Sequence, residues 1–165
     1  MAAGAMIWQD LLLDRWADRD ALSAATASAF KVSADTVAVV DAPEQLLAIS
    51  PSARIILECD RQHRDFPLQI TIVLRDDGLV GQFDGFEGAL QIARGLAQRL
   101  NAVVLFAEGP LSPSEWVRVR PTGKADIVSL DVDDSGVVDS FFVIGERALP
   151  EGQVGSAPKP TRLTA

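Results

Sequence analysis

Residues that could do chemistry are scarce in this chain. Its 165 residues include one His, His63, one Cys, Cys59, and no Tyr. General acid–base catalysis, nucleophilic catalysis and zinc binding draw heavily on these residue types. No Ser stands in the G-x-S-x-G context of a nucleophile elbow. We therefore expect a protein that is not an enzyme, with no catalytic residue, no metal site and no cofactor.

The two reactive residue types also have plain structural interpretations. Cys59 ends an apolar run and fits a buried small hydrophobe better than a nucleophile. His63 lies in the charged segment 60–65, which favours a solvated loop histidine.

One acidic segment has the spacing of a calcium loop. Asp131, Asp133 and Ser135 stand at positions one, three and five, a Gly follows at position six, and Asp139 falls at position nine. Position twelve, which needs a bidentate acid, is Phe142. The segment is equally well explained as a hairpin turn between two strands. A small-molecule or metal-ion binding domain centred on the Asp131–Asp139 loop is therefore the alternative hypothesis.

A second set of residues has the types that dominate protein interfaces. Trp116, Arg118 and Arg120 alternate with valines, so that in a strand they share one face. Trp and Arg are enriched among binding hot spots. The competing interpretation places Trp116 in the core and pairs the arginines with Asp126 or Asp131 on neighbouring strands.

Acidic residues cluster in the last third of the chain. No basic residue stands between Lys124 and Arg147. This run is either a solvated edge that resists sheet-to-sheet association or a patch for a basic partner. With the hot-spot types it supplies the candidate partner-binding residues Trp116, Arg118, Arg120, Asp126, Asp131, Asp133, Asp134 and Asp139.

The net charge of -8 limits the kinds of macromolecule that the chain could bind. Nucleic acid and acidic membrane surfaces are excluded, because both require clustered Lys and Arg. A basic protein would be attracted. One Cys cannot form an internal disulfide, and the first ten residues lack a basic region before an apolar run, so we expect a cytoplasmic protein.

Two helices are expected to position these residues. Asp18 or Asp20 would cap a helix that runs to about Phe30. The clearer helix begins at Asp84, which is followed three residues later by a Glu as in a capping box, and ends at Asn101. Residues 150–165, rich in Pro and Gly, read as a flexible tail.

Strands account for most of the remaining chain. Residues 7–16 are ambiguous, since 7–13 alternates as a strand while its Trp and Leu residues also match helical spacing. The segment 68–75 alternates cleanly, as in a sheet with one packed face and one largely solvated face. A polar loop is expected over 60–65 and a turn over 76–78. Further strands are expected over 36–40, 55–59, 103–106, 116–120, 127–132 and 137–144.

This order of elements predicts the fold class. Both helices connect strands in β-α-β fashion, with antiparallel strands around them. We expect a single α+β domain over residues 1–149, of two layers, with a mixed and mostly antiparallel sheet and two main helices packed on one face. The open face could also pair with a second copy of the chain as a homodimer.

The stretch 88–133 resembles a known class of protein in its layout. It contains a helix, the strand 102–106, the Pro-rich turn 109–113, the strand 116–121 and a strand that ends at Leu130 and Asp131. This order is similar to small acidic bacterial immunity proteins, which block secreted toxins by binding them. Acidic secretion chaperones of similar size are a second likeness. The resemblance implies inhibition of a partner protein, and it assigns no functional residue.

Our leading hypothesis is therefore a non-enzymatic, acidic protein-binding module that is steered by charge to a basic partner and anchored by aromatic side chains.

A calcium titration separates this hypothesis from the metal-ion alternative. If the Asp131–Asp139 loop binds calcium in the folded state, the melting temperature rises with calcium concentration, because a ligand of the native state stabilises it. Melting curves of the chain with EDTA and with millimolar calcium measure this. An unchanged melting temperature contradicts a metal site.

Overall fold

The computed structural model describes residues 4–107, 114–133 and 140–149, and within these residues nine strands form one mixed sheet. The strands are β1 (Met6–Leu13), β2 (Val37–Val40), β3 (Ile55–Arg61), β4 (His63–Arg64), β5 (Leu68–Leu74), β6 (Val104–Phe106), β7 (Glu115–Val119), β8 (Ala125–Asp133) and β9 (Ser140–Arg147). The helices are α1 (Arg19–Phe30), α2 (Asp77–Gln82) and α3 (Gly85–Leu100), with 3-10 turns η1 (Ala34–Thr36) and η2 (Pro43–Ala48). The sheet order is β2-β3-β5-β1-β6-β7-β8-β9-β4, and only β2–β3 and β4–β9 are parallel pairs. The predicted α+β class with a mixed, mostly antiparallel sheet is confirmed.

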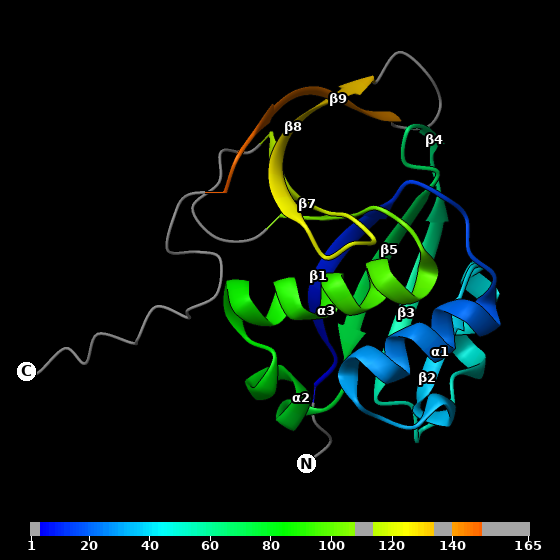
Figure 1. Cartoon of the computed structure of the whole chain (residues 1–165). Helices are drawn as coiled ribbons and strands as arrows, with labels where there is room; N and C mark the ends of the chain where they lie inside the picture. The colour runs from blue at the N-terminus through cyan, green and yellow to red at the C-terminus, as the bar shows by residue number, and fades with distance from the viewer. Residues whose placement is uncertain (1–3, 108–113, 134–139, 150–165) are drawn as a thin grey trace, which may run out of the picture.

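Helices α1 and α3 cover one face of the sheet and lie side by side (Figure 1). The Asp18 carboxylate accepts a hydrogen bond from the Ala21 N–H and so caps α1, as the sequence predicts. The backbones of Lys31 and Asn101 adopt left-handed φ angles of 58° and 48° and end α1 and α3. The start of α1 at Asp18 and the end of α3 at Asn101 therefore follow local signals in the chain.

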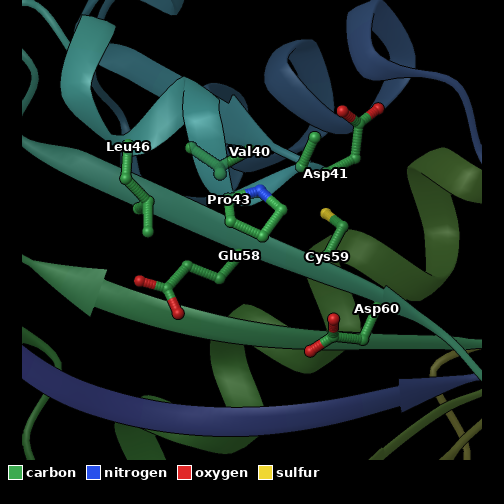
Figure 2. Close-up of a pocket in the computed structure, with 8 residues that line it drawn as sticks. Val40, Asp41, Pro43, Leu46, Glu58, Cys59 and Asp60 are labelled. Atoms are coloured by element: carbon green, nitrogen blue, oxygen red, sulfur yellow. The ribbon is translucent and has the colours of Figure 1, made fainter.

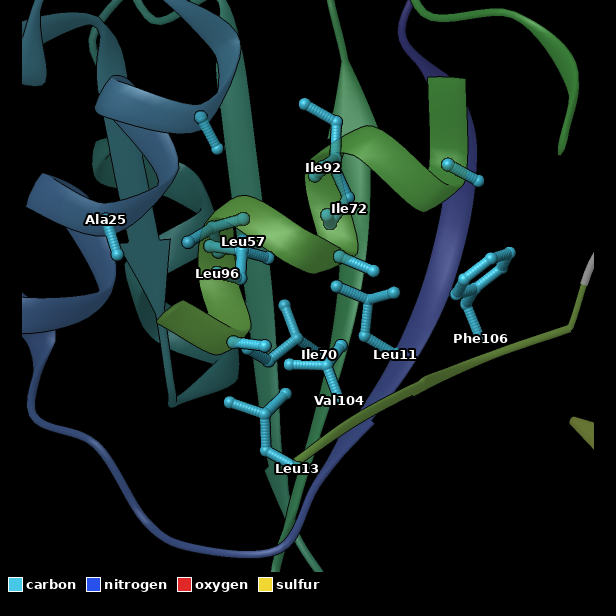
Figure 3. Close-up of a cluster of buried hydrophobic side chains, with 14 of the residues drawn as sticks. Leu11, Leu13, Ala25, Leu57, Ile70, Ile72, Ile92, Leu96, Val104 and Phe106 are labelled. Atoms are coloured by element: carbon cyan, nitrogen blue, oxygen red, sulfur yellow. The ribbon is translucent and has the colours of Figure 1, made fainter. Parts of the chain in front are cut away.

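The main core lies between these helices and the sheet (Figure 3). Alternate strand residues point into it, because side chains along a strand alternate between its two faces. Those at most 1% exposed are Leu11, Leu13, Ile55, Leu57, Leu68, Ile70, Ile72, Leu74, Val104, Phe106, Val117, Val119 and Ile127. Phe30 of α1 makes edge-to-face contacts with Trp8 and Phe83, at ring-centroid distances of 5.6 and 5.0 Å. The aromatic contacts tie α1 to the start of β1 and to the end of α2.

Strand β1 lies in the middle of the sheet, antiparallel to β5 on one side and to β6 on the other. Strands β5 and β6 are consequently parallel to each other, and α3 connects them across β1. The first helix likewise connects two parallel strands, β1 and β2, that are separated by β5 and β3. The ambiguous segment at the N-terminus is thus a strand, and both β-α-β connections are present.

The far half of the sheet curves back over the face opposite the helices. Figure 1 shows β7, β8 and β9 bending away from the helical layer toward β4. There β9 pairs with β4, at the register His63↔Ser140 and Arg64↔Phe141, and β4 directly follows β3 in the chain. The curve encloses a second buried cluster, formed by Leu12, Phe66, Leu105, Val128 and Leu130. The face that the sequence predicts to be largely solvated is therefore covered near β6–β8. Near β3 and β5 it carries a small third buried cluster of Val40, Ile56 and Val73 and is open only beside that cluster, where Asp60 is exposed.

Three local expectations are wrong. The polar loop over 60–65 is instead the end of β3 and the short strand β4, because backbone pairing with β9 overrides its polar composition. The turn over 76–78 is the start of α2, since the Asp76 carboxylate accepts hydrogen bonds from the N–H groups of Gly78 and Leu79. Asp84 does precede α3, but its side chain makes no capping hydrogen bond.

A pair of helical glycines tests the packing of α3. A Cβ on Gly88 would overlap the backbone carbonyl of Phe83, whereas nothing lies within 4 Å of a Cβ on Gly81 in α2. We expect Gly88→Ala to lower the free energy of unfolding by about 2 kcal/mol, because the backbone must shift. The matched variant Gly81→Ala should raise it by about 0.5–1 kcal/mol through helix propensity. Urea denaturation measures both, and a stabilised Gly88→Ala variant contradicts the packing.

Candidate functional site

The structure brings Arg118, Arg120 and Asp126 together on β7 and β8, where they form ion pairs with one another. Arg118 Nε donates to Asp126 Oδ1 at 2.8 Å, and Arg118 Nη1 donates to Glu146 Oε1 at 2.9 Å. Arg120 lies 3.5 Å from the same Asp126 carboxylate. Trp116 packs, partly buried, against the second cluster. These contacts match the competing interpretation, in which the arginines pair with acids on neighbouring strands.

Burial and the neighbouring arginines shift the pKa of Asp126 in opposite directions. Burial alone would raise the pKa of Asp126, but the hydrogen bonds and charge of Arg118, together with Arg120, hold that pKa below its usual value. The hydrogen bonds that the Arg118 guanidinium donates to Asp126 raise its own pKa, and the Arg118 side chain is 11% exposed. Both groups are therefore charged at neutral pH and satisfy each other, so partner binding by Arg118 would require breaking an existing pair.

The remaining acids of the candidate set are only partly described. Asp131 lies exposed in β8 opposite Phe142, and Asp133 is the last residue of that strand. Asp134 and Asp139 lie outside the described residues, as does the middle of the calcium-like loop. Within the part of the chain that the structure describes, no three His, Cys, Asp or Glu side chains are grouped to hold a metal ion.

The two reactive residue types lie on strands β3 and β4. Cys59 is buried in β3, and desolvation, reinforced by the charges of Asp41 and Asp60, raises the pKa of its thiol from 9.0 to about 12. The thiol is protonated at neutral pH, and a thiol in that state is a poor nucleophile. His63 belongs to β4 rather than to a loop, and its backbone pairs with β9.

A feature that the sequence did not reveal is a set of carboxylates on the open face of the sheet. The β pairing aligns Glu58 with Thr71 and Thr71 with Asp10, so that one row runs across β3, β5 and β1. In the next row Asp60 is aligned with Gln69. We call Asp10, Glu58 and Asp60 the acidic row. Their strand parity places all three on the side away from the helices.

The acidic row lacks a basic partner. None of the ion pairs among the described side chains involves Asp10, Glu58 or Asp60. Asp10 accepts a hydrogen bond of 2.7 Å from the Thr71 hydroxyl. The adjacent cation Arg61 instead places its guanidinium over the Trp16 ring, 4.2 Å from the centroid. The negative charge of this face is therefore not neutralised within the described part of the chain.

Apolar side chains border the acidic row. Ile7 is 69% exposed, and it lies in the same row as Val73 and Ile56, which are buried in a small cluster with Val40. On η2, Leu46 and Leu47 are 44% and 95% exposed. Exposed apolar area beside unpaired charge is typical of protein interaction surfaces. We define the open face as the acidic row together with Ile7 and Leu46.

The sequence indicates only part of this open face. The alternation of Glu58 and Asp60 in β3 indicates that the two share a face, but their distance from Asp10 depends on strand order. Since 48 residues separate Glu58 from Asp10 in the chain, only the pairing of β5 with both β3 and β1 brings them together.

Comparison with known proteins gives no family model that matches, no matching curated protein and no matching solved structure. Among the described helices, none has both the length and the apolar character needed to cross a membrane.

The Arg118–Asp126 pair gives a prediction on stability. We expect Asp126→Asn to lower the free energy of unfolding by about 2 kcal/mol at neutral pH, because it leaves a mostly buried guanidinium without its main partner. The exposed variant Asp35→Asn, which changes charge equally, should have little effect. Urea denaturation at a series of pH values measures both.

The pH dependence has a definite sign. Because the pKa of Asp126 is lower in the folded state, the pair stabilises above the unfolded carboxyl pKa of about 3.9 and loses its effect as pH falls through the folded value. The difference between wild type and Asp126→Asn should therefore shrink below about pH 4. A difference that persists undiminished at lower pH would show that the loss has another origin.

Proposed function

We propose that this chain is a non-enzymatic binding module that recognises a basic partner protein through the open face of β3, β5 and β1. The observation that carries the proposal is the acidic row, two carboxylates on β3 and one on β1, on either side of β5, none of which forms an ion pair with a described side chain. The Trp116–Arg118 face was the sequence-based candidate, but its charges already satisfy one another.

The physical case has two parts. Unpaired carboxylates attract a basic surface over a range of about 10 Å at moderate salt, and the net charge of -8 adds to this steering. Complementary charge increases the association rate and orients the two proteins more than it increases the affinity of their complex. The exposed side chains of Ile7 and Leu46 supply apolar area beside the charges, which a bound partner would remove from water. The face thus combines the steering and the burial that a specific complex requires.

The consequence of binding is proposed to be inhibition of the partner, as in the immunity-type proteins that the layout of residues 88–133 resembles. A chaperone of a secreted partner is the second form that the same binding could take. The protonated Cys59 thiol supports a role without catalysis. We propose a cytoplasmic location, which the single Cys supports because it cannot form an internal disulfide. The metal-ion alternative rests on the Asp131–Asp139 loop and is decided by the calcium titration.

Two charge-matched triple variants test the proposed face. The face variant carries Asp10→Asn, Glu58→Gln and Asp60→Asn. The control variant carries Asp35→Asn, Asp84→Asn and Glu87→Gln, three acids that form none of the ion pairs found among the described side chains. Both lose three negative charges and keep side-chain shape, so that a difference between them reports position rather than net charge.

The binding partner is captured on the immobilised chain from a lysate of the source cells, purified and titrated against each variant by calorimetry. We expect the face variant to bind at least about tenfold more weakly and the control to stay within about threefold. Raising salt from about 50 to 300 mM should weaken wild-type binding more than binding of the face variant. Equal affinity of the two triple variants, or a partner that is acidic, overturns the proposal.

A further inference from the structure

A pocket of about 130 Å³ opens on the acidic face where β2 and η2 meet β3 (Figure 2). Ligand sites for drug-sized molecules and cofactors occupy roughly 300–1,000 Å³. This pocket is too small for such a ligand and matches a single side chain. Its lining residues are Val40, Asp41, Ala42, Pro43, Leu46, Glu58, Cys59 and Asp60.

The pocket has an apolar wall and a charged rim. Val40, Pro43 and Leu46 form the wall, and Figure 2 shows them facing the strand that carries the acids. The rim carries Glu58 and Asp60, two positions apart on β3 and therefore on the same face. An occupant must combine an apolar stem with a positively charged head.

The third carboxylate at the pocket, Asp41, is already engaged. It accepts a hydrogen bond of 2.8 Å from the Gln45 side chain, and Arg19 lies 3.4 Å from it. The same arginine donates to the Val39 carbonyl at 2.6 Å. Asp41 is therefore part of the pocket's framework, and Glu58 and Asp60 are the two acids left for an occupant.

The spacing of these two acids favours one kind of cation. Positions i and i+2 of a strand lie about 6.6 Å apart. A guanidinium presents five N–H donors in a flat fork and can donate to two carboxylates at once, while an ammonium is a compact point charge. The propyl stem of an arginine can pack along the apolar wall while its head reaches the rim.

We propose that this pocket receives an arginine side chain of the partner protein, as the anchor of the complex. The inference rests on the proposed function and adds the residue type that is recognised. Arginine is among the residues most enriched at binding hot spots, where a side chain fills a pocket on the partner. The acidic row outside the pocket then steers the partner, and the pocket fixes its register.

Short peptides of one sequence test the anchor without knowledge of the partner. The probes are acetyl-Ala-X-Ala-X-Ala-amide peptides in which X is arginine, lysine or the neutral isostere citrulline. The ¹⁵N-labelled full chain is titrated with each at constant ionic strength, and amide shifts are followed by NMR. We expect the arginine peptide to shift amides of η2 and of residues 58–60, with an affinity at least about threefold above the lysine peptide and no such shifts with citrulline.

Variants on the same face distinguish a pocket from diffuse attraction. Glu58→Gln and Asp60→Asn should each weaken the arginine peptide at least about threefold, and Leu46→Ser, which removes apolar wall at a half-exposed position, should weaken it as well. Asp10→Asn is the matched control, since it removes one charge of the acidic row outside the pocket and should change affinity less than twofold. The spectrum of each variant shows directly whether it is folded.

Two results overturn the inference. One is equal affinity for arginine and lysine peptides together with equal losses in Asp10→Asn, Glu58→Gln and Asp60→Asn, which shows a diffusely acidic face. The other is the absence of shifts at η2 and residues 58–60 at millimolar arginine peptide. Both leave the proposed function standing, because that proposal fails separately, when the two triple variants bind the purified partner alike.

Discussion

The rest of the structure depends on the alternation of side chains along β1. This strand lies between β5 and β6, and its successive residues serve three environments. Leu11 and Leu13 enter the core under the helices, Leu12 enters the cluster enclosed by the curved half of the sheet, and Asp10 reaches the open face. A register shift of one residue would exchange all of these positions, so the strong burial of the three leucines fixes the register of the whole sheet.

The curvature of the sheet divides its second face into two parts with different roles. Where β7–β9 bend back, the face is buried and Asp126 of β8 pairs with Arg118 and Arg120. On the other part, Asp10 of β1 and Glu58 and Asp60 of β3 form no ion pair with a described side chain. The same residue types thus serve stability on one part and, in our proposal, recognition on the other. The two roles differ because of the side chains around each carboxylate. A carboxylate that is already paired with an arginine attracts a cation of a partner protein only weakly.

The framework of the pocket shows how the edge of the sheet supports the open face. Strand β2 is an edge strand, and the guanidinium of Arg19 covers its outward carbonyl at Val39 while it approaches Asp41. Occupied backbone groups discourage pairing of this edge with another chain. The short turn η2 then follows directly and carries the pocket's apolar wall. Protection of the edge and construction of the pocket therefore use the same few residues.

The sequence by itself determined the type and limits of a helix or strand wherever residues close together in the chain indicate them. Asp18 as a cap, Asn101 as the end of α3, and the alternation of residues 68–74 all depend on contacts within one element, and they predict its type and limits. The α+β class follows from the order of such elements. The errors at 60–65 and 76–78 arose where composition was polar but the backbone found partners, in β9 for the first and in the Asp76 carboxylate for the second.

Only the tertiary structure decided where the candidate site lies. Asp10, Glu58 and Thr71 are distant in the chain and meet because β5 pairs with both β3 and β1, a choice that no local pattern contains. Glu146 likewise reaches Arg118 only because β9 pairs with β8, whereas the Arg118–Asp126 pair lies within the β7–β8 hairpin and was already offered by the sequence. Strand order and curvature are set by the packing of all layers together, so charge composition predicts that an acidic surface exists, while long-range pairing determines which acids remain unpaired.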